Sequence, residues 1–350
     1  MEALVNTVNT VGVMGKGIAL QFKQAYPKNF RAYETACRRG EVRIGRMFVF
    51  ETGLLGQPRW IINFPTKQHW RSRSRLDDIK SGLTDLRRVL QARQVRSVAV
   101  PPLGCGNGGL DWREVLPLIA VALGDIPDVE VIVYPPKGAP PAHSMKVGTS
   151  RPSMTPGRAA MLTMLAQYTR LSSIEESAVR EGASLLEIQK LMYFLQEAGQ
   201  RLRLKYVKAQ YGPYAENLNP VLQALEGHYL RGYGDRSQQV MQLTPITLMP
   251  GAVDDGRKWL TDHPDDGTAA RIDAVLRLVT GFADAYGLEL LATVHWVLTH
   301  EDGELAADSS NLAKNVAAWN ARKGRLFTDV HVARAADRLR EHDWVAEPVN

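Results

Sequence analysis

Short apolar runs alternate with amphipathic patterns through the first 135 residues of the chain. Each run has the length of a buried strand, and the segment after it repeats apolar residues every three or four positions, as a helix does. Strands that are apolar on both faces belong to a sheet covered by helices on each side, so the pattern predicts an α/β/α sandwich. The expected strands are 2–6, 47–52, 60–64, 97–101 and 129–134, and the expected helices are 18–26, 29–39, 77–91 and 112–123.

The rest of the chain is patterned mainly as helices. Residues 136–156 are rich in proline, glycine and serine and have no period, which predicts a linker. We therefore expect a first domain at 1–135 and a mainly α-helical second domain at 157–350. The helices expected in the second domain are 157–170, 184–198, 213–226, 268–286, 288–300 and 329–340, with a strand pair near 240–248.

Two glycine-rich turns each join an expected strand to an expected helix. The first runs from Gly12 to Gly17 and the second from Gly104 to Gly109. Glycines allow positive φ and close approach of the backbone to a ligand, and the N–H groups that open a helix attract anions. Two such turns on one sheet suit a pyrophosphate, although neither matches the P-loop or the GxGxxG fingerprint. The alternative is an ordinary tight turn between strand and helix.

Composition and charge narrow the class of protein. The two cysteines, Cys37 and Cys105, exclude a disulfide framework, and the eight histidines show no metal-ligand spacing. No window reaches 18 apolar residues, so we expect a cytoplasmic protein with no membrane partner. The net charge of +6 divides unevenly, because residues 1–154 carry 22 basic and 12 acidic residues and residues 155–350 carry 21 and 25. The basic half suits a polyanion such as DNA and the acidic half a basic protein, unless both are only solvated surfaces.

Three motifs of the first half together resemble a macrodomain, the fold that binds ADP-ribose. They are Asn-Thr-Val-Asn-Thr-Val-Gly-Val-Met-Gly-Lys-Gly at 6–17, Ile-Ile-Asn-Phe-Pro-Thr-Lys at 61–67 and Pro-Leu-Gly-Cys-Gly at 102–106. Within the macrodomains, the motifs are most similar to the DNA ADP-ribosyl glycohydrolase antitoxins of the DarG family. The resemblance implies a macrodomain-type sandwich with a mixed sheet. The family has a further strand and a Gly-Asp segment before the position of Met1, so we expect that the adenine contact and one sheet edge are missing.

The second half carries a weaker resemblance. The segments 185–194 and 211–214, with Lys-Leu-Met-Tyr-Phe and Tyr-Gly-Pro-Tyr, resemble SocA-like antitoxin domains and also occur in the second half of DarG proteins. This similarity implies a domain that binds a DarT-type toxin, which is a DNA ADP-ribosyltransferase. The alternative is a helical bundle whose aromatic residues only form a core.

The resemblance assigns the catalytic role to Lys67. Glycosidic hydrolysis usually requires two carboxylates, yet the turns offer only Asp111, and Gly108 stands where related terminal-ADP-ribose glycohydrolases carry an aspartate. A lysine amine could instead attack C1″ of the ribose, provided that burial or nearby cations lower its pKa from about 10.4. Without the resemblance, the sequence would indicate that Lys67 is a solvated basic residue on a loop.

The same resemblance assigns the ADP-ribose-binding residues, whereas the roles of Cys105 and of the DNA-binding set are inferred from their residue types. Asn9 is expected to hold the distal ribose, or else to be a satisfied turn residue; Asn6 is expected to be structural, and Cys105 to be a packing residue. The ADP-ribose-binding set is Asn9, Thr10, Gly15, Lys16, Gly17, Thr66, Leu103, Gly104, Cys105, Gly106, Asn107 and Gly108. The DNA-binding set is His69, Trp70 and Arg71, which alternate aromatic and cationic groups and would otherwise be an exposed basic loop.

These observations predict an antitoxin in two parts. The first domain would remove ADP-ribose from modified bases, thymidine being the expected one, in single-stranded DNA, without a cofactor or metal. The second domain would bind the DarT-type toxin. The rival interpretations are hydrolysis of ADP-ribosylated protein side chains and a non-catalytic reader of ADP-ribose.

Overall fold

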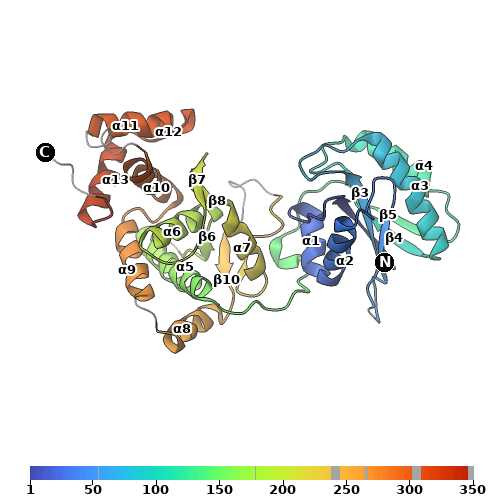
Figure 1. The fold of residues 1–350 in the computed structure, drawn as a ribbon, viewed down its shortest axis with the longest axis horizontal. Coiled ribbons are helices and arrows are strands. Elements are labelled where there is room, and N and C mark those ends of the chain that lie inside the picture. Colours follow the sequence, from blue (N-terminus) through green and yellow to red (C-terminus); the bar gives the residue numbers. More distant parts are fainter. Residues whose placement is uncertain (54, 178, 238–244, 265–266, 302–308, 346–350) are drawn as a thin grey trace. The chain divides into compact units, whose positions relative to one another are not determined.

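The computed structural model describes residues 1–53, 55–177, 179–237, 245–264, 267–301 and 309–345 (Figure 1). The chain divides into two compact units. Unit 1 contains Met1–Ser150 and the short segment Gly234–Gln238, and unit 2 contains Arg151–Tyr233 and Gln239–Asn350. The division at Ser150 falls inside the stretch that the sequence marks as a linker.

Unit 1 is built on a five-stranded sheet in the order β2-β3-β1-β4-β5. Strand β2 pairs antiparallel with β3, and the other pairs are parallel, so the sheet is mixed. The elements of unit 1 are β1 (Ala3–Asn9), α1 (Gly17–Ala25), α2 (Pro27–Arg38), β2 (Phe48–Glu51), β3 (Trp60–Lys67), α3 (Leu76–Ala92), β4 (Ser97–Val100), α4 (Trp112–Leu123), β5 (Glu130–Val133) and the 3-10 helix η1 (Ala142–Ser144). The expected α/β/α sandwich with a mixed sheet is confirmed.

Alternate residues of β1 supply the cores on the two faces of this sheet. Ala3 and Val5 pack in one cluster with α3 and α4, while Val8 packs in another with Met14 and Tyr33 of α2. Figure 1 shows α1 and α2 on the side of the sheet opposite α3 and α4. Because both faces are covered, β3 is buried along its whole length, which explains its nearly continuous apolar sequence.

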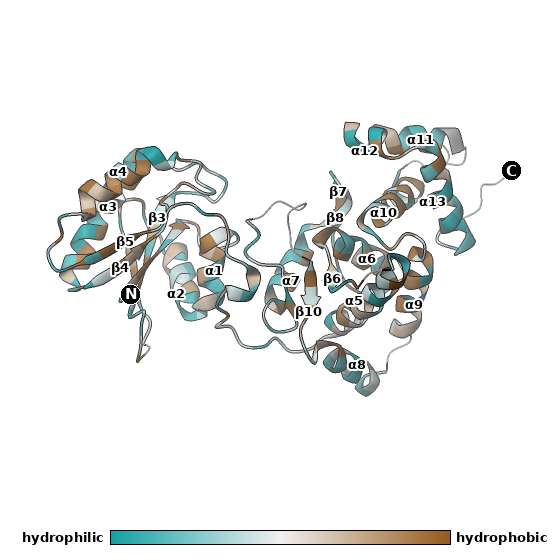
Figure 2. Cartoon of the chain, turned by 180° about the vertical axis from the view of Figure 1, so that it is seen from behind, coloured by the Kyte–Doolittle hydropathy of each residue, from teal (hydrophilic) through white to brown (hydrophobic). Residues whose placement is uncertain are grey.

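Unit 2 is mainly helical, as expected, and has a core of its own. Figure 2 shows that α6 and α10 are hydrophobic over much of their surface, in keeping with their central position in this core. The elements of unit 2 are α5 (Pro156–Glu175), β6 (Gly182–Ala183), α6 (Leu185–Glu197), β7 (Tyr206–Ala209), β8 (Gly212–Ala215), η2 (Glu216–Leu218), α7 (Asn219–Leu225), β9 (Leu230–Arg231), β10 (Ile246–Leu248), α8 (Ala252–Asp262), α9 (Thr268–Val279), α10 (Ala285–His300), α11 (Ser309–Ala318), α12 (Ala321–Leu326) and α13 (Asp329–Glu341).

The helix predicted at 213–226 is wrong at its start. Residues 212–215 form β8, which pairs antiparallel with β7 in a tight hairpin, and the helix α7 begins only at Asn219. Gly212 has a φ of 91°, where a side chain is strained, and a Cβ built at this position would lie 3.0 Å from Oγ1 of Thr293 and 3.4 Å from Nζ of Lys190. Tertiary packing therefore overrides the local helical pattern.

The predicted helix at 268–286 also differs from the structure. Helix α9 ends at Val279, Gly281 turns the chain at a φ of 82°, and Asp284 caps α10 by accepting from the N–H of Gly287 at 2.6 Å. Helices α8, α11 and α12 were not predicted. The strand pair predicted near 240–248 lies partly outside the described residues, and β10 within it pairs with β6 and β9.

Two buried lysines lie in the core of unit 2. Nζ of Lys190 donates to the carbonyl of Pro213 at 2.6 Å, and Nζ of Lys323 donates to Glu289 at 2.6 Å and to Thr293 at 3.0 Å. Burial lowers the pKa of Lys190 to about 7, with repulsion from Lys323 as a second cause. Burial also lowers the pKa of Lys323 to about 8, against the attraction of Glu289.

These lowered values make the stability of unit 2 depend on pH. The unfolded chain retains a proton on each lysine up to the ordinary pKa of 10.5, whereas the folded chain has released it, so the free energy of unfolding rises with pH above about 7. We expect the melting temperature of unit 2 to rise between about pH 7 and pH 9 and Lys190→Met to flatten this rise. Lys205→Met, at an exposed position, is the control and should leave the slope unchanged. Equal slopes in Lys190→Met and the native chain, measured by calorimetry, would contradict the expectation.

Candidate functional site

Three chain segments meet where the parallel strands of unit 1 end. Strand β1 lies between β3 and β4 and is parallel to both, so their carboxyl ends share one edge of the sheet. Ligands of open α/β sheets bind at this edge. Asn9 ends β1, Lys67 ends β3, and the second glycine turn follows β4.

Asn9 folds the first turn with its own side chain. Its Nδ2 donates to the carbonyl of Val13 at 2.6 Å, and its Oδ1 accepts from the N–H groups of Val11 at 3.0 Å and Val13 at 3.3 Å. The hydroxyl of Tyr33 donates to the Asn9 carbonyl at 2.6 Å. The structure thus gives Asn9 the turn-forming role, and its contact with a ribose stays a prediction.

Asn6, Thr66 and Thr10 support the same edge. Nδ2 of Asn6 donates to Asn63 at 2.9 Å in the buried layer between β1 and β3, in agreement with a structural role. The hydroxyl of Thr66 donates to the Val8 carbonyl at 3.4 Å, and that of Thr10 to the Gln68 carbonyl at 2.8 Å. These contacts join the ends of the two strands.

The start of α1 lies against the second turn. Gly15 and the exposed Lys16 lead into Gly17, whose φ is 61°, and a Cβ at Gly17 would lie 3.3 Å from Nδ2 of Asn107. The N–H of Gly17 donates to the carbonyl of Asp235 at 2.8 Å, and Gln21 donates to its carboxylate at 2.6 Å. Asp235 therefore already accepts from the N–H of Gly17, a residue that the sequence analysis assigned to ADP-ribose binding.

The second turn presents consecutive backbone N–H groups. Those of Gly106, Asn107 and Gly108 have no hydrogen-bond partner among the described residues, and such a run forms a nest for an anion. A Cβ at Gly106 would meet nothing within 4 Å, so the space above this residue is open. A Cβ at Gly108 would overlap the Gly104 carbonyl and Oγ of Ser74, so this glycine is required by the fold of the turn.

Lys67 is buried beside this turn. Its side chain is only 9% exposed, and Nζ donates to the carbonyl of Asn107 at 2.8 Å and to that of Trp70 at 3.1 Å. Burial lowers the pKa of Lys67, and within the described part of the chain no carboxylate forms an ion pair with it. The amine is therefore held in place without a counterion, which favours its neutral form.

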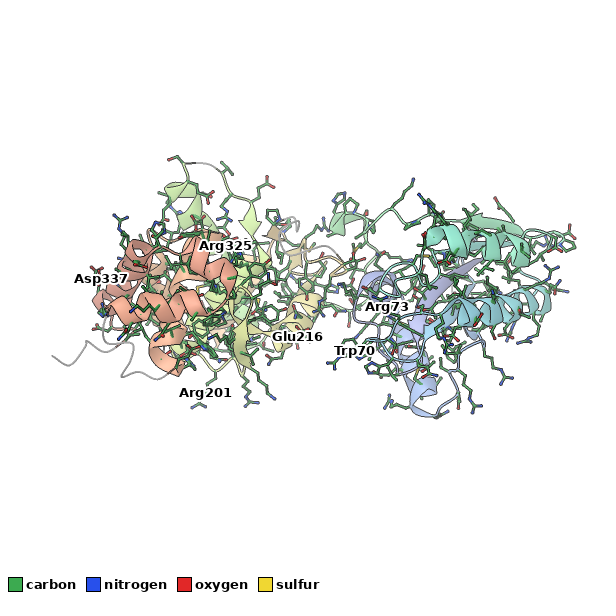
Figure 3. All side chains as sticks on the ribbon, turned by 90° about the horizontal axis from the view of Figure 1, so that it is seen from above. Trp70, Arg73, Arg201, Glu216, Arg325 and Asp337 are labelled. Carbon is green, nitrogen blue, oxygen red and sulfur yellow. The ribbon has the colours of Figure 1, made fainter. Side chains whose placement is uncertain are left out.

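An aromatic and basic surface follows Lys67. The rings of His69 and Trp70 lie 5.2 Å apart, and the guanidinium of Arg71 lies 4.5 Å from the Trp70 ring centre. Trp70 is 46% exposed. Figure 3 shows the side chains of Trp70 and Arg73 in unit 1, on the segment after β3. This arrangement offers a base a stacking face and a phosphate a cation.

Cys105 and Asp111 are less suited to catalysis. Burial, and secondly the charge of Asp111, raises the pKa of the Cys105 thiol to about 11, and Sγ donates to the Leu103 carbonyl at 3.5 Å. Asp111 caps α4 by accepting from the N–H of Arg113 at 2.9 Å. In the described ranges, no group of three or more His, Cys, Asp and Glu could hold a metal. Likewise, no helix described here is long and apolar enough to cross a membrane.

Two residues of the site had no signal in the sequence. Ser74 is buried, its N–H donates to the Gly108 carbonyl at 3.0 Å, and its Oγ has no partner among the described groups. Asp235 lies 214 residues from Gln21 in sequence. A contact between residues so far apart in the chain produces no periodic pattern or motif in the sequence, so it could not be predicted.

Residues 5–119 match the Macro domain family. Over 99% of its length the chain is 49% identical to a DNA ADP-ribosyl glycohydrolase of Thermus aquaticus, of which 93% is covered. It is 47% identical over 97% of its length to the enzyme of that name from Mycobacterium tuberculosis, of which 95% is covered. A fusion protein of Thermosipho africanus, named as DNA ADP-ribosyl transferase and DNA ADP-ribosyl glycohydrolase, is 35% identical over 39% of each chain. Among solved structures, the macrodomain of Mycobacterium tuberculosis DarG is 62% identical over 39% of this chain and 90% of its own, with a TM-score of 0.39.

Proposed function

The chain belongs to the DNA ADP-ribosyl glycohydrolase family, and on this premise we propose that unit 1 removes ADP-ribose from thymidine bases in single-stranded DNA, with Lys67 as the catalytic residue. The observation that carries this proposal is the position of Lys67. Its Nζ is buried, has no counterion among the described residues and is bound to the carbonyl of Asn107, in the turn whose N–H groups form the anion nest. A substrate whose diphosphate lies in that nest brings its distal ribose to the amine.

The reaction then has two steps. In the first, the neutral amine of Lys67 forms a bond to C1″ as the bond from C1″ to the base breaks, and the base nitrogen takes up the proton that the amine loses, which leaves a glycosylamine. In the second, the C1″–O4″ bond of this glycosylamine opens to give an imine, water adds to the imine carbon, and the bond from C1″ to Nζ breaks, which restores the amine and releases ADP-ribose. The first step requires a neutral amine, and burial supplies this condition. The negatively charged diphosphate stays in the nest throughout.

The DNA strand is proposed to lie on the surface formed by His69, Trp70 and Arg71. Single-stranded DNA binds where aromatic rings offer stacking and cations contact phosphates. The Trp70 carbonyl accepts from Nζ of Lys67, so this surface is directly connected to the reacting amine. The excess of basic residues in 1–154 also favours a polyanionic substrate.

One assay tests the substrate class. The protein is incubated with an oligonucleotide that carries ADP-ribosylated thymidine and, separately, with a protein ADP-ribosylated on its side chains. We expect release of ADP-ribose from the oligonucleotide only. Release from the protein alone would exclude DNA as the substrate, and release from neither would leave only a reader of ADP-ribose.

We further propose that unit 2 binds a DarT-type toxin. The Thermosipho africanus relative joins a DNA ADP-ribosyl transferase and a glycohydrolase in one chain, which supports an association of the two activities. Residues 155–350 carry more acidic than basic residues, and an acidic surface complements an enzyme that binds DNA. The two units would then act at successive stages, the first on the modified DNA and the second on the toxin.

Gly106→Glu is expected to eliminate the binding of ADP-ribose. The new carboxylate would stand in the open space of the nest and repel the diphosphate, and the loss of one charge-assisted hydrogen bond alone costs about 1.5–3 kcal/mol. Titration calorimetry with ADP-ribose measures the effect. Gly56→Glu is the matched control, because that glycine also has open space and no positive φ and lies far along the chain from the turn. Native affinity in Gly106→Glu would mean that the phosphates lie elsewhere.

A further inference from the structure

An open pocket of about 450 Å³ lies just beyond Asn9 and Lys67. Thr10 and Val11, which follow Asn9, form one wall, and Gln68 and His69, which follow Lys67, form another. The third wall is the segment 42–44, which leads from α2 towards β2. The volume is within the range of about 300–1,000 Å³ that is typical of small-molecule sites.

The walls combine apolar, amide and cationic groups. Val11 is 47% exposed and Ile44 is half-buried, so two of the segments that line the pocket contribute apolar surface. The side-chain amide of Gln68 has no partner among the described residues and offers both a donor and an acceptor. Nε of Arg43 donates to the Gly40 carbonyl at 3.1 Å, and this guanidinium forms no ion pair within the described part of the chain.

The order of groups in the substrate matches the order of sites along this edge. The diphosphate belongs to the nest at Gly106–Gly108, the distal ribose to Nζ of Lys67, and the group bonded to C1″ must continue beyond the amine. Gln68 and His69 are the next residues of the chain, and they open into the pocket. The leaving group therefore falls where a planar apolar ring with polar edges can be held. A DNA strand that continues from this base has a phosphate next to the pocket, and the exposed Arg43 among the lining residues can contact it.

We propose that this pocket holds the thymine base that leaves C1″, with the Gln68 amide on the edge of the base and Arg43 on the neighbouring backbone phosphate. The proposal rests on the glycohydrolase activity of unit 1 proposed above and adds two specificity residues, Gln68 and Arg43, to that reaction. It explains how one edge of the sheet distinguishes ADP-ribosylated DNA from ADP-ribosylated protein. An aliphatic side chain has no ring for the pocket, and no protein side chain brings the neighbouring backbone phosphate for Arg43.

Three single variants distinguish the contribution of the contact with the base from that of the contact with the phosphate. They are Gln68→Ala, Arg43→Ala and, as the matched control, Arg46→Ala, which removes an exposed arginine of the same segment that does not line the pocket. Each is assayed with an oligonucleotide carrying ADP-ribosylated thymidine and with the ADP-ribosylated thymidine nucleoside, which lacks the neighbouring phosphate. The affinity for free ADP-ribose is measured by calorimetry, and a melting curve shows that each variant is folded.

Gln68→Ala is expected to lower kcat/KM about tenfold on both substrates, the effect of a lost hydrogen bond to a buried polar edge. Arg43→Ala is expected to raise KM about fivefold on the oligonucleotide only. The slope of log KM against log salt concentration should also fall by about one, as expected when one phosphate contact is lost. Both variants should bind free ADP-ribose within about twofold of the native protein, since neither contacts the nest.

The outcomes distinguish the two proposals. If the native protein acts on the oligonucleotide but Gln68→Ala and Arg43→Ala behave like it, the pocket is not the base site and only the present inference fails. If Arg46→Ala raises KM as much as Arg43→Ala, the increase reflects the loss of positive charge in this loop and not a specific phosphate contact. The assignment of Arg43 is then overturned. If the native protein releases no ADP-ribose from DNA, the proposed function itself fails.

Discussion

Replacing Lys67 by alanine is expected to stop the release of ADP-ribose from DNA and to leave the affinity for free ADP-ribose within a few-fold of the native value. The two effects separate because we assign the diphosphate to the N–H groups of Gly106–Gly108 and not to the lysine. Loss of a positioned reacting side chain costs at least about 10²–10⁴ in rate. Single-turnover kinetics on ADP-ribosylated oligonucleotide and calorimetry with ADP-ribose measure the two quantities on the same sample. Turnover near the native rate would remove Lys67 from the mechanism.

The pH dependence gives this prediction a second, independent measurement. The amine must be neutral to attack, so the rate should be low at acid pH and rise with a single proton loss as the pH passes the pKa of Lys67. Burial lowers that pKa, so the midpoint of the rise should lie below the ordinary value of 10.5. Lys67→Arg is the matched control, because it preserves the positive charge beside the nest but cannot lose its proton. If Lys67 acted only as a cation, Lys67→Arg would retain activity, and the native rate would fall as the pH rises.

Unit 1 follows closely from its sequence because its strands are apolar on both faces and short. Strand β3, buried at every position, could not be anything other than a central strand between two layers. What the sequence did not reveal are contacts between side chain and distant backbone. The bond from Lys67 to the Asn107 carbonyl crosses 40 residues, and no local pattern encodes such a contact.

Unit 2 follows its sequence less closely for a related reason. The helix around Lys190 was predicted correctly, but a second helix was predicted to start at residue 213. The structure instead forms the hairpin of β7 and β8 there and fixes it against α6 through the bond from Lys190 to the Pro213 carbonyl. Gly212 has a positive φ, and a Cβ built there would lie within 3.4 Å of Lys190 and Thr293. The resemblance to antitoxin domains therefore depends on residues that build the fold. Those that contact a partner must be sought on the exposed surface.

Unit 2 alone is expected to bind a DarT-type toxin and to prevent its modification of DNA. The hydrophobic core of this unit contains only its own residues, so it should fold without unit 1. The structure also shows at which residue the isolated unit 2 should begin. Starting at Arg151 retains the ion pair of Arg151 with Asp255 at 2.6 Å and the Thr155 side chain that caps α5, both of which a start at residue 157 would remove.

If unit 2 mimics the charge of DNA, its binding to the toxin should show two measurable properties. If carboxylates of unit 2 take the places of DNA phosphates, single-stranded oligonucleotide should displace unit 2 from the toxin. The affinity should also fall as salt rises, because exposed charges are screened beyond about 8 Å at physiological ionic strength. A pull-down with purified toxin, repeated at several salt concentrations and with added oligonucleotide, measures both effects, and a DNA-modification assay measures inhibition. Absence of binding would contradict the neutralising role, whereas inhibition that neither salt nor oligonucleotide relieves would leave that role intact and exclude mimicry as its basis.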